Sequence, residues 1–150
     1  MEAMDADQRK KGHPLIRAGI NGKVDYRFVQ LVRLLEESNP GFVSVGEKSD
    51  PGDELMRFGG SFGFAFPAED IDEIRQGTEG ENPVQVKLNF LSLGGAFGPL
   101  PLPYSQLVLE QYNQKDRGIA AFLNTFVHRL ASLVFRVKRH YTPSLDGTSV

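Results

Sequence analysis

Cysteine and tryptophan are both absent from the 150 residues of this chain. Without cysteine the chain has no disulfide framework, no cysteine-ligated zinc, no thiol redox chemistry and no cysteine nucleophile. A large excess of charge is also missing, because 17 Lys and Arg stand against 19 Asp and Glu. This balance argues against a nucleic-acid-binding protein, whose affinity depends on a concentrated basic surface.

Long hydrophobic runs are missing as well. Residues 1–11 are polar and charged, unlike a secretory signal, and no stretch approaches the roughly 20 apolar residues of a membrane-spanning helix. These absences predict a cytoplasmic protein without membrane insertion. The length suits one hydrophobic core. We expect one domain at 18–142, a flexible arm at 1–17 and a disordered tail at 143–150.

Residues 25–38 have the apolar spacing of an amphipathic helix. Asp25 is a suitable N-cap residue, and Pro40 and Gly41 follow the last helical residues. One face of this helix gathers its apolar residues, and they are Phe28, Leu31, Val32 and Leu35.

Residues 116–141 form the longest predicted helix. Asp116 can cap its first turn, and Arg136–His140 bring cations to its carboxyl end, where they complement the helix dipole. Its apolar residues keep helical spacing for more than four turns, so we expect them to form the spine of the domain. They are Ile119, Phe122, Leu123, Phe126, Leu130, Leu133, Val134 and Val137.

Residues 42–45, 55–66 and 84–91 are predicted strands, because apolar residues alternate there. Acidic residues after Pro67 predict the first turn of a short helix that ends near Gly77. A second short helix is expected from Ser105 to about Tyr112. Few strands with helices at both ends predict an α+β fold. We expect a small antiparallel or mixed sheet, about three to four helices and long Gly/Pro-rich loops.

The segment 92–104 has three prolines and three glycines, which exclude regular structure, yet it is rich in apolar residues. We therefore expect it to dock its side chains. Contacts with a partner protein are placed on this segment and on whichever face of the 116–141 helix remains uncovered. The alternative, internal packing of both segments, explains them equally well. The candidate partner-binding residues are Leu93, Phe97, Leu100, Leu102 and Tyr104.

Two patterns in the sequence could form chemical sites. The turn Gly94–Gly98 follows a strand but lacks the ending of a phosphate-binding loop, so a ligand- or nucleotide-binding α+β module is only the alternative function. His128 and His140 lie about 18 Å apart on one helix and cannot share a metal ion. We expect His128 to be structural. No pattern of a serine nucleophile appears. The sequence therefore predicts no enzyme, no metal and no cofactor.

Four segments, in order, resemble the TssG family of type VI secretion baseplate proteins, also called ImpH or VasB. The resemblance covers about Leu15 to Tyr141 and corresponds to the N-terminal half of the family, so a truncated or split gene product is expected. Arg57, Phe58, Phe122, Phe126, His128 and Arg129 belong to its motifs. Asn124 stands where the family favours Asp. The four segments are FVQLVRLLE (28–36), RF and FAFPA (57–68), FLSLGGAFGPLPLPY (90–104), and Asp116 with FLNTFVHRL (122–130).

This resemblance implies a structural role. The family supplies a subunit of the baseplate wedge, which joins TssF, contacts TssE and engages TssK. It implies a cytoplasmic location, with assembly at the inner face of the inner membrane.

Overall fold

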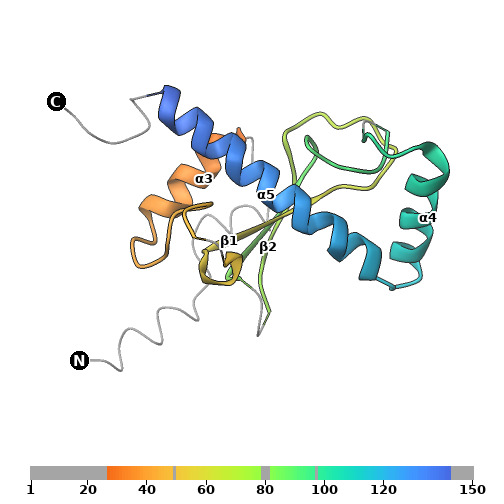
Figure 1. The fold of residues 1–150 in the computed structure, drawn as a ribbon, viewed down its shortest axis with the longest axis horizontal. Helices are drawn as coiled ribbons and strands as arrows, with labels where there is room; N and C mark the ends of the chain where they lie inside the picture. Colours follow the sequence, from red (N-terminus) through yellow and green to blue (C-terminus); the bar gives the residue numbers. More distant parts are fainter. Residues whose placement is uncertain (1–26, 49, 79–81, 97, 143–150) are drawn as a thin grey trace.

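The computed structural model describes residues 27–48, 50–78, 82–96 and 98–142 (Figure 1). The expected arm at 1–17 and tail at 143–150 lie outside these residues, so the division of the chain stays a prediction. The elements, in chain order, are α3 (Phe28–Glu37), the 3-10 turn η1 (Pro51–Asp53), β1 (Met56–Gly60), β2 (Ile71–Gln76), β3 (Val84–Leu88), α4 (Leu102–Asn113) and α5 (Gly118–Tyr141).

The three strands form one mixed sheet in the order β1-β3-β2. β1 pairs with β3 in parallel, and β2 pairs with β3 in antiparallel orientation. Together with three α-helices among the described residues, this sheet confirms the predicted α+β fold. β1 is an edge strand, so only one of its sides is paired with another strand.

The apolar face of α3 is confirmed. Phe28, Leu31, Val32 and Leu35 are all buried, and they pack with the sheet, with Val45 and with the second half of α5. The helix begins at Phe28 rather than at the predicted Asp25, and Arg27 at its N-cap makes no side-chain capping bond. A carboxylate that is distant in the sequence caps the helix instead. Phe28 N donates a long hydrogen bond of 3.5 Å to Asp70 Oδ2.

The short helix predicted between Pro67 and Gly77 is wrong, since this segment contains β2. Ile71 and Ile74 are both buried. They are three residues apart, which is also the spacing of residues on one face of a helix. A register shift between Ile71 and Glu73 adds a residue to the strand, and it lets both isoleucines face the core. Asp72 lies on this strand beside Lys87 of β3, with 3.1 Å between Oδ2 and Nζ.

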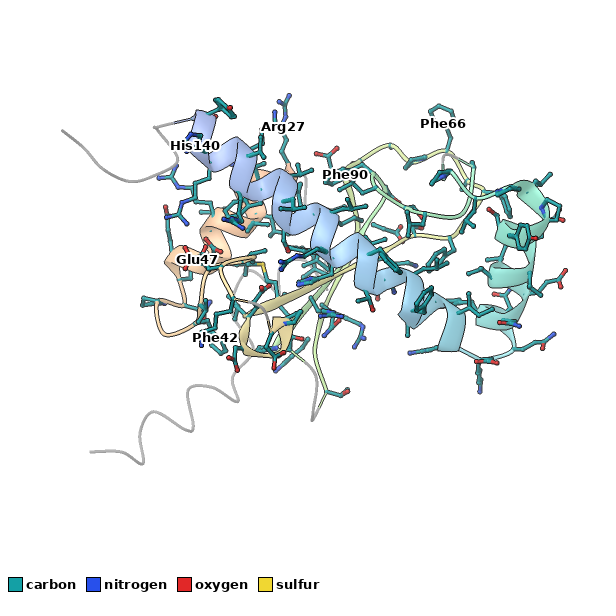
Figure 2. The ribbon with its side chains drawn as sticks, in the orientation of Figure 1. Arg27, Phe42, Glu47, Phe66, Phe90 and His140 are labelled. Carbon is teal, nitrogen blue, oxygen red and sulfur yellow. The ribbon has the colours of Figure 1, made fainter. Side chains whose placement is uncertain are left out.

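All three predicted strands are shorter than expected or missing, and the one at 84–91 ends at Leu88 as β3. The strand at 55–66 ends at Gly60, because its pairing partner β3 ends at Leu88. Beyond it Phe62 is buried, whereas Phe64 and Phe66 are exposed, so the three do not share a face; Figure 2 shows Phe66 pointing away from the body of the molecule. Residues 42–45 form only an isolated bridge, from Val43 to Glu54.

α4 begins at Leu102, three residues before the predicted start. Ser105 is not its cap but a buried residue inside it, and its hydroxyl donates to Leu100 O at 3.3 Å. Val108 is buried, whereas Leu107 is exposed. The last part of the proline-rich segment is therefore helical.

α5 crosses the front of the molecule in Figure 1, from α4 at its amino-terminal end to α3 near its carboxyl-terminal end. It packs mainly against β1. The helix is confirmed, but the prediction that its long apolar stripe forms the spine of the domain is wrong. Most of that stripe is exposed, and a different face of α5 is buried.

Candidate interaction surface

The buried face of α5 consists mostly of small and polar residues, together with Val127 and Phe135. Small side chains let the helix approach the sheet closely, and the glycines of β1 have the same effect, since a Cβ on Gly59 would lie 3.1 Å from Asn124 Nδ2. The buried residues of α5 are Ala120, Val127, His128, Ala131, Ser132 and Phe135.

Asn124 and His128 bind the free edge of β1. Gly60 N donates to Asn124 Oδ1 at 2.9 Å, and Phe58 N donates to His128 Nδ1 at 3.2 Å. The spacing matches, because four residues of a helix rise about 6.0 Å and two residues of a strand about 6.6 Å. These side chains thus satisfy the amide groups that an added strand would otherwise pair with.

His128 is held as one neutral tautomer. Because Phe58 N donates to Nδ1, that nitrogen carries no proton, and the proton of the neutral ring is on Nε2. Nε2 lies 3.2 Å from Glu54 Oε2, and the ring stacks on Phe58 with centroids 5.6 Å apart. The contact between Nε2 and Oε2 is not aligned as a hydrogen bond, since Oε2 has no hydrogen-bond partner among the described residues. The other oxygen, Oε1, accepts from Gly46 N at 3.0 Å.

Burial shifts both groups toward their neutral forms. Removal from water lowers the pKa of His128 to about 4, and the charges of Arg57 and Arg129 add to this effect. Burial also raises the pKa of Glu54, although the Gly46 amide and the two arginines oppose the rise. A histidine that stays neutral at pH 7 packs here as part of the core. Its predicted structural role agrees with this geometry and stays a prediction.

The basic carboxyl end of α5 holds the loop that follows α3. Arg136 Nη1 donates to Gly46 O at 3.2 Å, and Arg139 Nη1 donates to Ser44 Oγ at 3.2 Å. Gly46 has a φ of +79°, and a Cβ there would lie 3.0 Å from the Arg136 side chain. From the sequence, these cations were expected only to complement the helix dipole, and their contacts with this loop were not predicted.

The outer face of α5 carries a continuous apolar row, which we call the α5 stripe: Ile119, Phe122, Phe126, Leu130, Leu133, Val137 and Tyr141, all exposed. Phe122 is 63% exposed and Phe126 49% exposed, and their rings meet edge to face at 5.2 Å. Near Tyr141 the stripe borders a hollow of about 570 Å³ that it shares with Ser44 and Glu47.

By length and composition alone, α5 would also pass as a membrane-spanning helix. Core helices of soluble proteins pass the same test. The buried face of α5, with its bonds to β1, shows that this helix is part of the folded domain.

The predicted partner-binding residues differ in their exposure. Leu93 and Leu100 are half-buried, and Leu100 N donates to Leu93 O at 3.1 Å. Leu102 and Tyr104 lie on the first turn of α4 and are exposed. Phe97 lies outside the described residues. The assignment of these five residues to a partner stays a prediction.

The remaining motif residues lie in four different environments. Phe58 is buried in the core, and Phe122 and Phe126 lie on the α5 stripe. Arg129 is exposed beside that stripe. Arg57 lines a groove of about 420 Å³ between the sheet, α4 and the start of α5.

The glycine-rich turn packs backbone against backbone. Gly94 and Gly95 are buried, and Gly95 has a φ of +88°, with its Cα so near Gly63 that a Cβ would lie 2.6 Å from Gly63 O. Close packing thus explains glycine here without a bound phosphate. Among the residues that the structure describes, no group of three His, Asp or Glu side chains could hold a metal ion.

The family model described as "Type VI secretion, TssG" matches residues 24–148. This range includes every described element. No curated protein and no solved structure matches the chain.

Proposed function

The chain belongs to the TssG family of type VI secretion proteins, and from this premise we propose that it is a structural subunit of the baseplate wedge and not an enzyme. In this proposal it binds other baseplate subunits through the α5 stripe. The observation that carries the proposal is the exposure of this row of large apolar side chains on a helix whose opposite face is fully engaged.

Exposed apolar surface of this kind is unfavourable in water and marks interaction sites. The stripe runs from Ile119 to Tyr141, about 33 Å of helix. Aromatic side chains such as Phe122 and Phe126 are enriched among the residues that dominate binding energy at protein interfaces. The bonds from α5 to β1 and to Gly46 keep the helix in place, so the stripe is presented on a rigid support.

The proposed partners are those that the resemblance to the family implies. We propose that the chain joins TssF and contacts TssE and TssK, in the cytoplasm at the inner face of the inner membrane. Leu102 and Tyr104, exposed on α4, are a second candidate contact for one of these partners.

Co-purification with TssF tests the proposal. In the variant Phe126→Asp combined with Leu133→Asp, charged groups interrupt the stripe at exposed positions, so the fold is retained and the complex is lost. Phe42→Asp is the matched control, because Phe42 is also an exposed phenylalanine (40%) but lies in the loop after α3 (Figure 2). If the double variant binds TssF as well as the Phe42 variant does, the proposal is wrong.

A further inference from the structure

We propose that the α5 stripe docks lengthwise on an acidic amphipathic helix of a partner protein, in a nearly straight contact between two helices. This inference rests on the proposed function, because it specifies the chemistry of the partner that the stripe binds.

The spacing of the stripe indicates a helical partner. Successive residues of the stripe are three, four and four positions apart, and this series occurs twice between Ile119 and Tyr141. Ile119, Leu130 and Tyr141 are therefore eleven residues apart in turn. An eleven-residue repeat has about 3.67 residues per turn, close to the 3.6 of a straight α-helix, and it favours a slight right-handed supercoil. A second helix lying along α5 would touch every residue of the stripe.

The charges beside the stripe indicate an acidic partner. α5 contains no Asp or Glu, whereas it carries Arg129, Arg136, Lys138 and Arg139. Arg129 and Arg136 are exposed and seven residues apart, so they lie on the same side of the stripe, about 10 Å from each other. This is the flanking position from which charged side chains select the partner in paired helices. Arg136 also donates to Gly46 O, which leaves Arg129 as the main charge available to a partner.

A second copy of this chain fits the surface less well. In an antiparallel pair of α5 helices, the flank with Arg129 and Arg136 would face the same flank of the other copy, and like charges would repel. In a parallel pair, each arginine row would face the opposite flank, where Leu123 and Val134 are apolar and half-buried. Neither arrangement gives the arginines an acidic neighbour.

An anionic lipid surface is the other class of partner that apolar and basic residues suggest. Arg129 lies beside the middle of the stripe, between Phe126 and Leu130, and not at one end of the helix. A flat membrane would need to bury this charge among the apolar residues, whereas a flanking carboxylate on a helix can pair with it. The observations favour the protein partner.

Two synthetic peptides test the proposal by fluorescence anisotropy with the full chain. Both are helices of about 22 residues with apolar residues at steps of three, four and four, long enough to be helical in water. One carries Glu along the flank and the other carries Lys. Because each exposed ion pair contributes little, we expect the Glu peptide to bind about tenfold more tightly than the Lys peptide, with a smaller ratio at high salt. Equal affinities would overturn the proposal.

Charge reversal at one residue sharpens the test. In Arg129→Glu the preference for the Glu peptide should fall about tenfold, while Lys138→Glu, also on α5 but away from the arginine flank, leaves it unchanged. Circular dichroism shows whether both variants keep the fold. The wild-type comparison of the two peptides needs no variant, so the proposal remains testable if Arg129→Glu does not fold.

Two further measurements separate the other partners. The first is co-sedimentation with vesicles of phosphatidylcholine and phosphatidylglycerol. If the chain binds these vesicles and neither peptide, the partner of the stripe is a membrane and not a protein. The second is sedimentation velocity. If the chain forms dimers and the dimers do not bind the peptides, the stripe binds a second copy of this chain. If both peptides fail while Phe126→Asp with Leu133→Asp still abolishes TssF binding, the inference is wrong and the proposed function stands.

Discussion

α3 and α5 have the same kind of sequence pattern and opposite surroundings. Both are amphipathic, with apolar residues at helical spacing. The apolar face of α3 lies in the core, with Leu31 1% exposed, whereas the corresponding residues of α5 face solvent, with Phe122 63% exposed. Periodicity therefore identified two helices correctly, but it did not tell where the apolar face of each one would find its partner.

The opposite face of α5 explains the difference. A helix packs where its shape and hydrogen-bonding groups match a neighbour, and the residues that match β1 are small or polar. Asn124 and His128 satisfy two edge amides, and the backbone of β1 comes close because Gly59 and Gly60 have no side chain. With this face engaged by the sheet, the α5 stripe is left for another molecule.

The largest expected contrast is between one core residue of α3 and one residue of the α5 stripe. Leu31→Ala should lower the free energy of unfolding by about 2–5 kcal/mol, because it removes buried methyl groups and leaves a cavity. Phe126→Ala should change it by no more than about 0.5 kcal/mol, since the side chain is exposed in the isolated chain. Urea unfolding measures both values. A loss of several kcal/mol for Phe126→Ala would show that the stripe is part of the core.

The buried face of α5 should make stability depend on pH. His128 has a folded-state pKa of about 4 against the 6.5 of an unperturbed histidine, so between these pH values the unfolded chain binds a proton that the folded chain does not. Stability from this group is complete above pH 6.5 and is lost as pH falls toward 4. The total is on the order of 3 kcal/mol.

Urea unfolding at several pH values, compared between the wild type and His128→Asn, isolates this effect. The raised pKa of Glu54 acts in the opposite direction, because the folded chain then binds the proton more readily, and Glu54 is present in both proteins. The slope between pH 6.5 and 4 should be smaller in the variant. Identical slopes would mean that His128 is not buried as a neutral ring.

The bond from Asn124 to the β1 edge should give a smaller effect. Asn124→Ala leaves the amide of Gly60 without its acceptor and should cost about 1 kcal/mol of unfolding free energy. Asn124→Asp keeps an acceptor oxygen at the same position, so thermal unfolding should place it within about 0.5 kcal/mol of the wild type. An equal cost for both substitutions would show that the bond to Gly60 contributes nothing.

Local signals in the sequence predicted the fold class, the two long helices and the central strand β3. They failed where contacts distant in the chain decide the structure. Ile71 and Ile74 looked helical because a register shift in β2 cannot be read from spacing. The cap of α3 comes from Asp70, which follows it by 42 positions.

The candidate site was partly predictable. The uncovered face of the last helix was one of two places where partner contacts were expected. The residues that form this face could not be predicted, because they depend on where β1 packs against the helix. One available signal was the spacing of Asn124 and His128, one helical turn apart on a face with Ala120 and Ala131. Polar and small residues aligned in this way can mark the side of a helix that binds an edge strand. Four motifs in order indicated the family, which the match over residues 24–148 supports.

Photo-crosslinking in a complex with TssF tests most directly whether the α5 stripe is an interface. A photoreactive phenylalanine analogue at position 126 replaces an exposed ring on the stripe, and the same analogue at position 42 replaces an exposed ring outside it. The account predicts a crosslink to TssF from position 126 and none from position 42. Complex formation without any crosslink from position 126, or equal crosslinking from both positions, would contradict it.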